Sequence, residues 1–216
     1  MKKILLLAIL FFVFNYTFAQ AEKFEPVAQF GIKQGVNYSS VLFSPGIKQG
    51  IKLGYNGGFV FKYKNEKFFA LQVELNYSEK GWLEEFDTIP NTYQRNLNYI
   101  ELPFMTHVYF GKQALQFYVN LGSSVGYLVN EKEIKEINDE LYAREYYETV
   151  IENKFDFNVL AELGITLDTN IGEFQAGFRY AMTLTDIFKY TSDSFFEESQ
   201  NQVISFSLNY YFIDNR

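Results

Sequence analysis

The strongest constraint on the fold is a strict alternation of apolar and other residues in eight segments of the chain. In residues 155–167 every odd position is apolar, from Phe155 to Leu167, whereas the even positions are mostly polar or small. Successive side chains of a β-strand point to opposite faces, so this period of two predicts a strand with one apolar face. The same pattern occurs in residues 29–39, 51–63, 68–78, 98–110, 115–129, 172–184 and 202–212.

The connections between these segments alternate strictly between long and short. Four-residue turns occupy residues 64–67, 111–114 and 168–171, and the long connections are residues 40–50, 79–97, 130–153 and 185–201. Bacterial outer-membrane barrels have an even number of antiparallel strands, short periplasmic turns and longer extracellular loops. A tilted strand of about 9–11 residues crosses a bilayer. The sequence therefore predicts an all-β fold, an eight-stranded antiparallel up-and-down transmembrane β-barrel.

The N-terminus has the order of a secretory signal peptide. Lys2 and Lys3 precede an apolar run over residues 4–14, and small residues then allow cleavage before Gln20 or before Glu22. The apolar run is too short for a membrane-spanning helix, which needs about 20 residues. We therefore predict an exported protein of the cell outer membrane. Its predicted parts are a signal peptide (1–19), a periplasmic N-terminal segment (20–28), the barrel (29–212) and a C-terminal tail (213–216).

Composition excludes several classes of function. The formal net charge of −7 leaves no basic field for nucleic acid, and the absence of Cys excludes disulfides and thiolate metal sites. His107 is the only His, so neither a metal site nor a cofactor is predicted. Acyl-transfer chemistry needs a Ser activated by a base, and no Ser is a same-face neighbour of His107. The chain is therefore not expected to be an enzyme, and a lipid-modifying barrel enzyme is the less favoured alternative.

The composition of the two strand faces indicates which one meets lipid. The apolar faces are rich in Phe and Leu and carry Tyr near their ends, as in the aromatic girdles of membrane barrels. The opposite faces carry mainly Gly, Ser, Asn and Gln, which suit a crowded lumen better than a solvated exterior. A soluble periplasmic ligand-binding barrel, with the apolar face inward, is the alternative. Pro103 lies within a predicted strand and removes a ladder donor, so we expect a local bulge or an unpaired carbonyl there.

The inward faces place charged residues in a narrow lumen. An eight-stranded barrel has an interior only wide enough for side chains to fill, and buried charges persist when they are paired. We therefore predict a plug of ion pairs with Arg179 and Lys62 as hubs for Glu74, Glu101 and Glu162. The alternative function is a narrow ion or small-solute channel. The predicted lumen network consists of Lys33, Lys62, Glu74, Glu101, Asp156, Glu162, Glu173 and Arg179.

The long connections are the predicted recognition surface. Residues 130–153 are rich in acidic side chains, and we expect a short helix over residues 131–147. Tyr142, Tyr146 and Tyr147 are the candidate contact residues for a partner protein. The connection at 185–201, which carries Phe188, Tyr190, Phe195 and Phe196, is a second candidate exposed aromatic surface. These features predict a structural or interaction protein that acts through its extracellular loops.

Four stretches resemble the PorT-type outer-membrane β-barrel family of Gram-negative bacteria. They are residues 31–39 (GIKQGVNYS), 71–81 (LQVELNYSEKG), 97–104 (LNYIELPF) and 155–164 (FDFNVLAELG). The resemblance covers most of the exported chain and includes Pro103. It implies a β-barrel in outer-membrane lipid. The namesake of the family is an accessory of the type IX protein-secretion route, so the resemblance also implies an envelope or secretion-system protein as a partner.

Overall fold

The chain forms one closed antiparallel β-barrel. The computed structural model describes residues 24–86, 91–112, 114–136, 146–189 and 195–212. Eight long strands each pair with their neighbours along the chain, and pairing of the first with the last closes the barrel. A ninth, two-residue strand pairs with the end of β4. The strands are β1 (Val27–Ser44), β2 (Gln49–Gly50), β3 (Lys52–Glu66), β4 (Phe69–Glu84), β5 (Thr92–Lys112), β6 (Leu115–Glu136), β7 (Phe155–Thr169), β8 (Gly172–Thr183) and β9 (Glu198–Tyr211).

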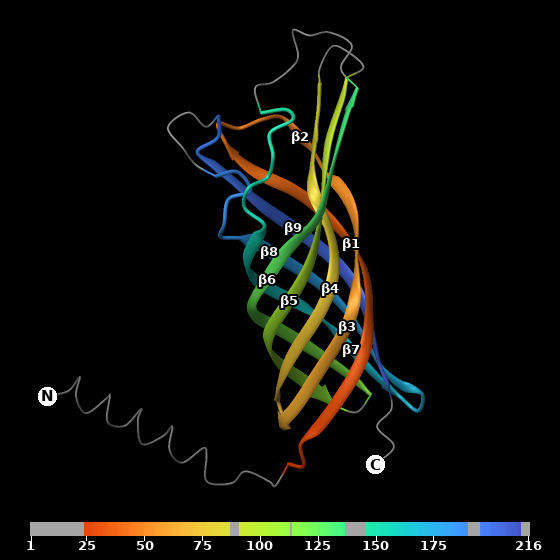
Figure 1. The fold of residues 1–216 in the computed structure, drawn as a ribbon. Coiled ribbons are helices and arrows are strands. Elements are labelled where there is room, and N and C mark those ends of the chain that lie inside the picture. The colour runs from red at the N-terminus through yellow and green to blue at the C-terminus, as the bar shows by residue number, and fades with distance from the viewer. Residues whose placement is uncertain (1–23, 87–90, 113, 137–145, 190–194, 213–216) are drawn as a thin grey trace, which may run out of the picture.

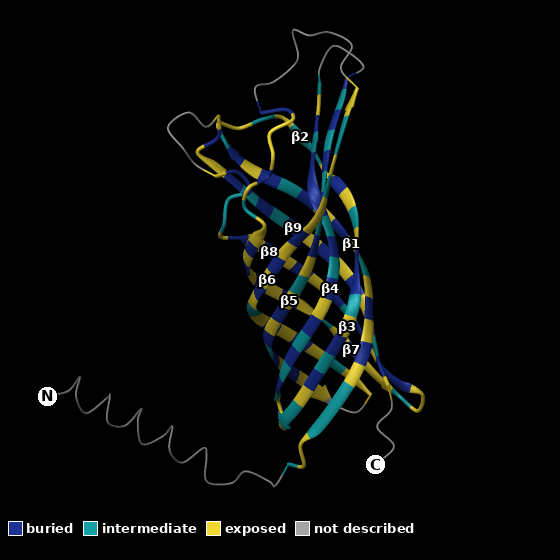
Figure 2. Ribbon diagram, in the orientation of Figure 1, coloured by how far each residue is buried: buried dark blue, intermediate teal, exposed yellow. Residues whose placement is uncertain are grey.

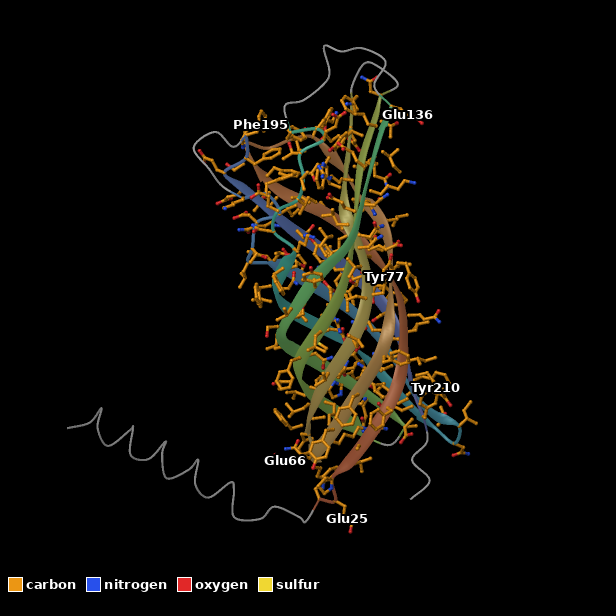
Figure 3. All side chains as sticks on the ribbon, in the orientation of Figure 1. Glu25, Glu66, Tyr77, Glu136, Phe195 and Tyr210 are labelled. Atoms are coloured by element: carbon orange, nitrogen blue, oxygen red, sulfur yellow. The ribbon has the colours of Figure 1, made fainter. Side chains whose placement is uncertain are left out.

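The two ends of the barrel differ, as Figure 1 shows. The start of β1, the end of β9 and the tight connections β3–β4, β5–β6 and β7–β8 lie at the lower end. The long connections lie at the upper end, and β4, β5 and β6 rise above the remaining strands there. Side chains labelled in Figure 3 mark these ends, with Glu66 and Tyr210 below and Glu136 and Phe195 above. The predicted eight-stranded up-and-down barrel is thus confirmed.

Most strands are longer than the alternation predicts, and β1, for example, continues to Ser44 and β9 begins at Glu198. The expected connection at 79–97 is mostly strand, because β4 continues to Glu84 and β5 begins at Thr92. The expected helix over residues 131–147 is wrong for its first part, since β6 continues to Glu136. The β5–β6 ladder extends to the pair Thr92↔Glu136, so pairing across the sheet overrides the helix preference of this Glu- and Lys-rich segment. Residues 137–145 lie outside the described residues.

The barrel places its apolar face outward, as the alternating colours of Figure 2 show. On β7, Leu163 is 61% exposed, whereas its neighbour Glu162 is 2% exposed. Leu121 on β6 and Phe59 on β3 are likewise exposed. This orientation contradicts the alternative of a soluble barrel with an apolar cavity, and it agrees with an outer-membrane barrel. No helix within the described ranges is long and apolar enough to cross a membrane.

The β4–β5 ladder is irregular at Pro103, where the sequence predicts a disturbance. The β4–β5 ladder lacks the pairs between Val73↔Phe104 and Asn76↔Glu101, yet the register is the same on both sides of the gap. Of the two expected features, a bulge or an unpaired carbonyl, the bulge is absent because no residue is inserted. The interrupted ladder agrees with the loss of a donor at Pro103, on which the expectation rests. The β5–β6 ladder does shift its register, at Asn98/Tyr99. β1 begins at Val27, slightly before the predicted start of the barrel at residue 29, and residues 1–23 lie outside the described part.

Candidate functional site

The lumen is filled by polar and charged side chains that project from all eight long strands. All eight residues of the predicted lumen network lie on the inward face, and seven of them are buried. Glu101 is half-buried. Two further cations, Lys64 and Lys80, join them. These ten residues, five cations and five carboxylates, are arranged in three clusters along the barrel axis.

The middle cluster is organised by Arg179 on β8. Its Nη1 and Nη2 atoms donate to the Glu74 carboxylate at 3.0 and 2.7 Å, and its Nε donates to Glu162 at 2.6 Å. Lys33 Nζ lies 2.9 Å from the same Glu74 carboxylate. Bidentate Arg–carboxylate pairs are strong and directional, so this cluster ties β1, β4, β7 and β8 together across the lumen. It contains two cations and two carboxylates and is electrically balanced.

The lower cluster lies nearer the short turns and centres on Glu173. Lys62 forms an ion pair with its carboxylate, and Lys64 Nζ lies 2.6 Å from it. Lys62 also sits over the Tyr211 ring, 3.9 Å from its centroid, in cation–π geometry. Gln29 Nε2 donates to Glu173 at 3.2 Å. This cluster holds two cations and one carboxylate.

The upper cluster has the opposite imbalance. Lys80 forms ion pairs with both Glu101 and Asp156, the latter at 2.7 Å. Asn158 Nδ2 donates to Asp156 at 3.0 Å, and Thr183 Oγ1 donates to Asn158 at 2.6 Å. Because the lower cluster carries one excess positive charge and the upper cluster one excess negative charge, the three clusters together are neutral.

The predicted hubs are correct in part. Arg179 bridges Glu74 and Glu162 as expected, but Lys62 pairs with Glu173 and not with the three carboxylates predicted for it. Glu101 is instead paired with Lys80, which lies beyond residue 78, where the predicted strand ends. The signal that could have identified Lys80 is parity, because it continues the inward positions 74, 76 and 78.

A small cavity separates two of the clusters. A cavity of about 20 Å³ lies between the middle and upper clusters, bordered by Asn37, Lys80, Glu101 and Arg179. A water molecule needs about 10–15 Å³ on this measure, so the cavity accommodates about one. Apart from the half-buried Glu101, the inward polar and charged side chains around this cavity are buried, as expected for a barrel of eight strands whose interior side chains fill.

An aromatic cluster closes the upper end of the lumen. Trp82 and Tyr93 project inward from the raised parts of β4 and β5, and both are fully buried. Tyr147, from the β6–β7 connection, stacks on Tyr93 with ring centroids 3.9 Å apart. Phe196, from the β8–β9 connection, stacks on Phe43 of β1 at 4.2 Å. Val41, Leu97, Tyr99, Leu128, Tyr146, Ile151, Ile187 and Phe188 complete this mouth cluster.

A buried carboxylate fixes the β6–β7 connection over the mouth cluster. Glu84 accepts hydrogen bonds from the hydroxyls of Tyr146 at 2.8 Å and Tyr147 at 2.9 Å. Arg95 donates to the Thr149 carbonyl at 2.5 Å and pairs with Glu131 at 3.1 Å. These contacts order residues 146–151 against the barrel.

The burial of the mouth cluster corrects the predicted recognition surface. Tyr146 and Tyr147 are only 3% and 7% exposed, so they pack inside the protein and do not present contact surfaces. Phe188 and Phe196 are also buried, whereas Phe195 is 41% exposed. Packing of the aromatic rings against each other is more favourable than their exposure to water. The sequence around each ring does not reveal which other rings it packs against. Tyr142 and Tyr190 lie outside the described residues.

His107 lies on the inward face of β5 and is 1% exposed. Its Nδ1 is 2.6 Å from Asn120 Oδ1, and its ring lies between those of Tyr109 and Tyr118, at 5.5 and 4.9 Å between centroids. These contacts are those of a packed, hydrogen-bonded side chain. Within the described residues, no group of three or more His, Asp and Glu side chains is arranged to hold a metal ion.

Comparisons with known proteins concern the whole barrel. A family model described as an outer membrane protein beta-barrel domain matches residues 18–189. No curated protein matches the sequence. Among solved structures, Neisserial surface protein A (NspA) aligns over 86% of this chain and 99% of its own, at 12% identity and a TM-score of 0.44.

Two further solved structures are similar over a comparable length. Ail, the attachment invasion locus protein of Yersinia pestis, aligns over 86% of this chain and 99% of its own, at 10% identity and a TM-score of 0.41. The outer membrane enzyme PagL aligns over 85% of this chain and 98% of its own, at 8% identity and a TM-score of 0.46. At these identities and TM-scores, none of the three similarities indicates what this chain does.

Proposed function

The chain belongs to the outer membrane protein beta-barrel domain family and resides in the outer membrane, and from this premise we propose that it is a non-conducting barrel that acts as a structural or interaction protein at its extracellular end. The observation that carries the proposal is the occupied lumen. Paired charges fill its length, and a buried aromatic cluster covers its upper end.

The charge arrangement opposes the alternative of a narrow ion channel. A permeating ion would have to separate pairs such as Arg179–Glu74, whose side chains are almost completely buried. Breaking a buried pair leaves an uncompensated charge and costs about 3–5 kcal/mol. An ion would meet three such clusters in series and then the mouth cluster. The network is therefore suited to holding the barrel closed.

Planar-bilayer recordings test the proposal. We expect the reconstituted protein to give no steady conductance over a range of applied voltages, and a porin reconstituted in parallel confirms that insertion succeeds. A steady conductance on the nanosiemens scale would contradict the closed lumen and favour the channel. Proteoliposome swelling with small sugars gives a second, independent measure of permeability.

A role as an accessory of protein secretion is the second candidate. It is favoured by the PorT-type resemblance of residues 71–81 and 97–104, which map to β4 and β5. Both strands contribute to the part of the barrel that rises above the rest (Figure 1). Deleting the gene in the native host and measuring export of secreted proteins tests this role. Unchanged export would contradict it and leave the structural role.

We propose no catalytic activity for this barrel. The position of His107 supports this, because its Nδ1 lies beside Asn120 and its ring packs against Tyr109 and Tyr118. Hydrolysis of the acyl-transfer type needs a Ser beside the base. Incubation with radiolabelled lipopolysaccharide should release no acyl chain. Release that is lost in the His107→Asn variant would establish the enzyme alternative instead.

A further inference from the structure

The backbone ladder between β3 and β4 is interrupted near the extracellular end, and pairing with β4 resumes only at β2, in the pairs Gly50↔Leu83 and Gln49↔Glu84. The β3–β4 ladder ends at Asn56↔Ser78, although both strands continue beyond this pair. β3 continues alongside β1 to the pair Ser39↔Lys52, and β4 continues alongside β5 to Glu84↔Tyr93. In Figure 1 the upper parts of β4, β5 and β6 accordingly rise away from β1.

Side chains replace the missing backbone ladder along this interruption. Asn37 Nδ2 donates to the Glu79 carbonyl at 3.0 Å, and Ser39 Oγ donates to the Gly81 carbonyl at 3.0 Å. On the outer side, the Tyr55 amide donates to the Glu79 carboxylate at 3.0 Å. The two strands therefore stay connected without a backbone ladder, and their backbones remain close, since a Cβ atom on Gly54 would lie 2.3 Å from the Glu79 carbonyl oxygen. A groove lies on their outer side.

The groove has a volume of about 290 Å³. That is close to the lower limit for pockets that hold small ligands, about 300 Å³. Gly81, with φ of +126°, lies on β4 where a Cβ atom would be 1.9 Å from the Arg95 carbonyl oxygen of β5. The glycine thus allows β4 and β5 to approach each other closely at this level. The polar lining includes Lys52, Glu79, Asn96, Asn98, Asn130 and Lys132.

The groove lies directly above the lipid-facing belt. On β4, β5 and β6 one outward row consists of the paired residues Tyr77, Ile100 and Tyr127. The next outward row toward the extracellular end consists of Glu79, Asn98 and Asn130. The surface therefore changes from apolar to polar between these rows on β4 and β5, and just above Val129, which the register shift leaves exposed, on β6. Such a change marks the level of lipid headgroups. Tyr77 marks this level in Figure 3.

We propose that this groove binds the phosphorylated sugar headgroup of an outer-leaflet glycolipid. Lys52 and Lys132 supply two ammonium groups, and the Glu79 carboxylate already accepts a hydrogen bond from the Tyr55 amide. The groove therefore has an excess of positive charge, which suits a phosphate. The amides of Asn96, Asn98 and Asn130 offer the donors and acceptors that sugar hydroxyls need. The acyl chains would lie along the apolar row below.

Lipid binding by the purified protein in phosphatidylcholine nanodiscs tests the proposal, with bisphosphorylated lipid A as the probe. We expect Lys132→Gln to weaken binding about tenfold, the effect of losing one charge-assisted contact, and Lys52→Gln/Lys132→Gln to weaken it further. Lipid A without phosphates should bind the unaltered protein about tenfold more weakly. The matched control is Lys154→Gln/Lys189→Gln, which removes two exposed charges outside the groove and should leave affinity unchanged.

Three results would overturn the proposal. These are unchanged affinity in both groove variants, equal weakening in the control variant, and equal affinity for lipid A with and without phosphates. Glucosamine 1-phosphate separates a membrane lipid from a soluble ligand, since binding it as tightly as lipid A would contradict the lipid source. Lys52 is buried and its loss could affect folding, so the exposed Lys132→Gln variant decides the outcome if the double variant does not fold.

Discussion

Replacing Arg179 by Met tests whether the lumen charges hold the barrel together. Arg179 makes two hydrogen bonds to Glu74, at 3.0 and 2.7 Å, and one to Glu162 at 2.6 Å. Without it, Lys33 is the remaining cation beside two buried carboxylates, so the middle cluster acquires an uncompensated negative charge. Removing one partner of a buried pair typically costs about 3–5 kcal/mol, and we expect a loss of unfolding free energy in this range.

A second substitution in the same cluster separates charge balance from packing. Glu162→Gln in the Arg179→Met background leaves the balanced pair Lys33–Glu74, while the amide oxygen can still accept from Tyr118 and Asn120. We expect the double variant to recover about 2 kcal/mol relative to Arg179→Met alone, because the unpaired carboxylate is gone. A recovery of this size is a coupling between the two positions and not a sum of independent effects.

Equilibrium urea unfolding in lipid vesicles, followed by the electrophoretic mobility of unheated samples, measures these differences. Lys135→Met is the control, because Lys135 is in an exposed ion pair with Glu148 outside the lumen and its loss should not alter the midpoint. If Arg179→Met were within about 0.5 kcal/mol of the unaltered protein, or if the double variant were no more stable than the single one, the structural role of the network would be refuted.

Three further predictions concern the mouth, the groove and the lipid face. Glu84→Leu removes the acceptor of two buried Tyr hydroxyls, and each unsatisfied group costs about 1–3 kcal/mol. The substitution should therefore speed hydrogen exchange in residues 146–151, and unchanged exchange would argue against the closed mouth. Gly81→Val should cost about 1–3 kcal/mol in vesicle unfolding because of its φ of +126°, whereas Gly46→Ala, with 3.9 Å to the nearest atom, should cost nothing measurable. Leu163→Arg should destabilise the barrel by about 2–4 kcal/mol in the same assay, and a neutral effect would place this residue outside the lipid belt.

The membrane-spanning part of the fold could be predicted from sequence because lipid imposes a strict rule on it. Each outward residue such as Phe157 or Leu163 must be apolar, and each inward neighbour such as Asn158 or Glu162 must fit a polar lumen. Above the belt this rule ends. Outward positions there include Asn98 and other amides beside it. Apolar and polar residues therefore no longer alternate along the sequence, although the strands continue. The upper ends of β4, β5 and β6 were therefore not predicted.

The candidate site was predicted only where the alternation of inward and outward positions was enough to place a residue in the lumen. The inward position of Arg179 and its carboxylate partners follows from alternation within the lipid belt. Partner choice depends on which strands face each other across the lumen, so Lys62 was assigned the wrong carboxylates. The mouth cluster joins residues far apart in the chain, such as Tyr93 with Tyr147, and no local pattern encodes such contacts. Acidic loop composition instead suggested solvent exposure for residues that are buried.

Oxygen accessibility of spin labels tests most directly that the apolar face meets lipid and the ionic face meets the lumen. The chain has no Cys, so single-cysteine variants need no other change. In vesicles we expect a label at Leu121→Cys to collide with oxygen and to be shielded from a water-soluble nickel complex, and Ser124→Cys to resist labelling until the barrel unfolds. Lys132→Cys is the water-exposed control. A Leu121→Cys label that collides with the nickel complex as readily as one at Lys132→Cys would contradict the orientation from which the lumen, the mouth and the groove are all derived.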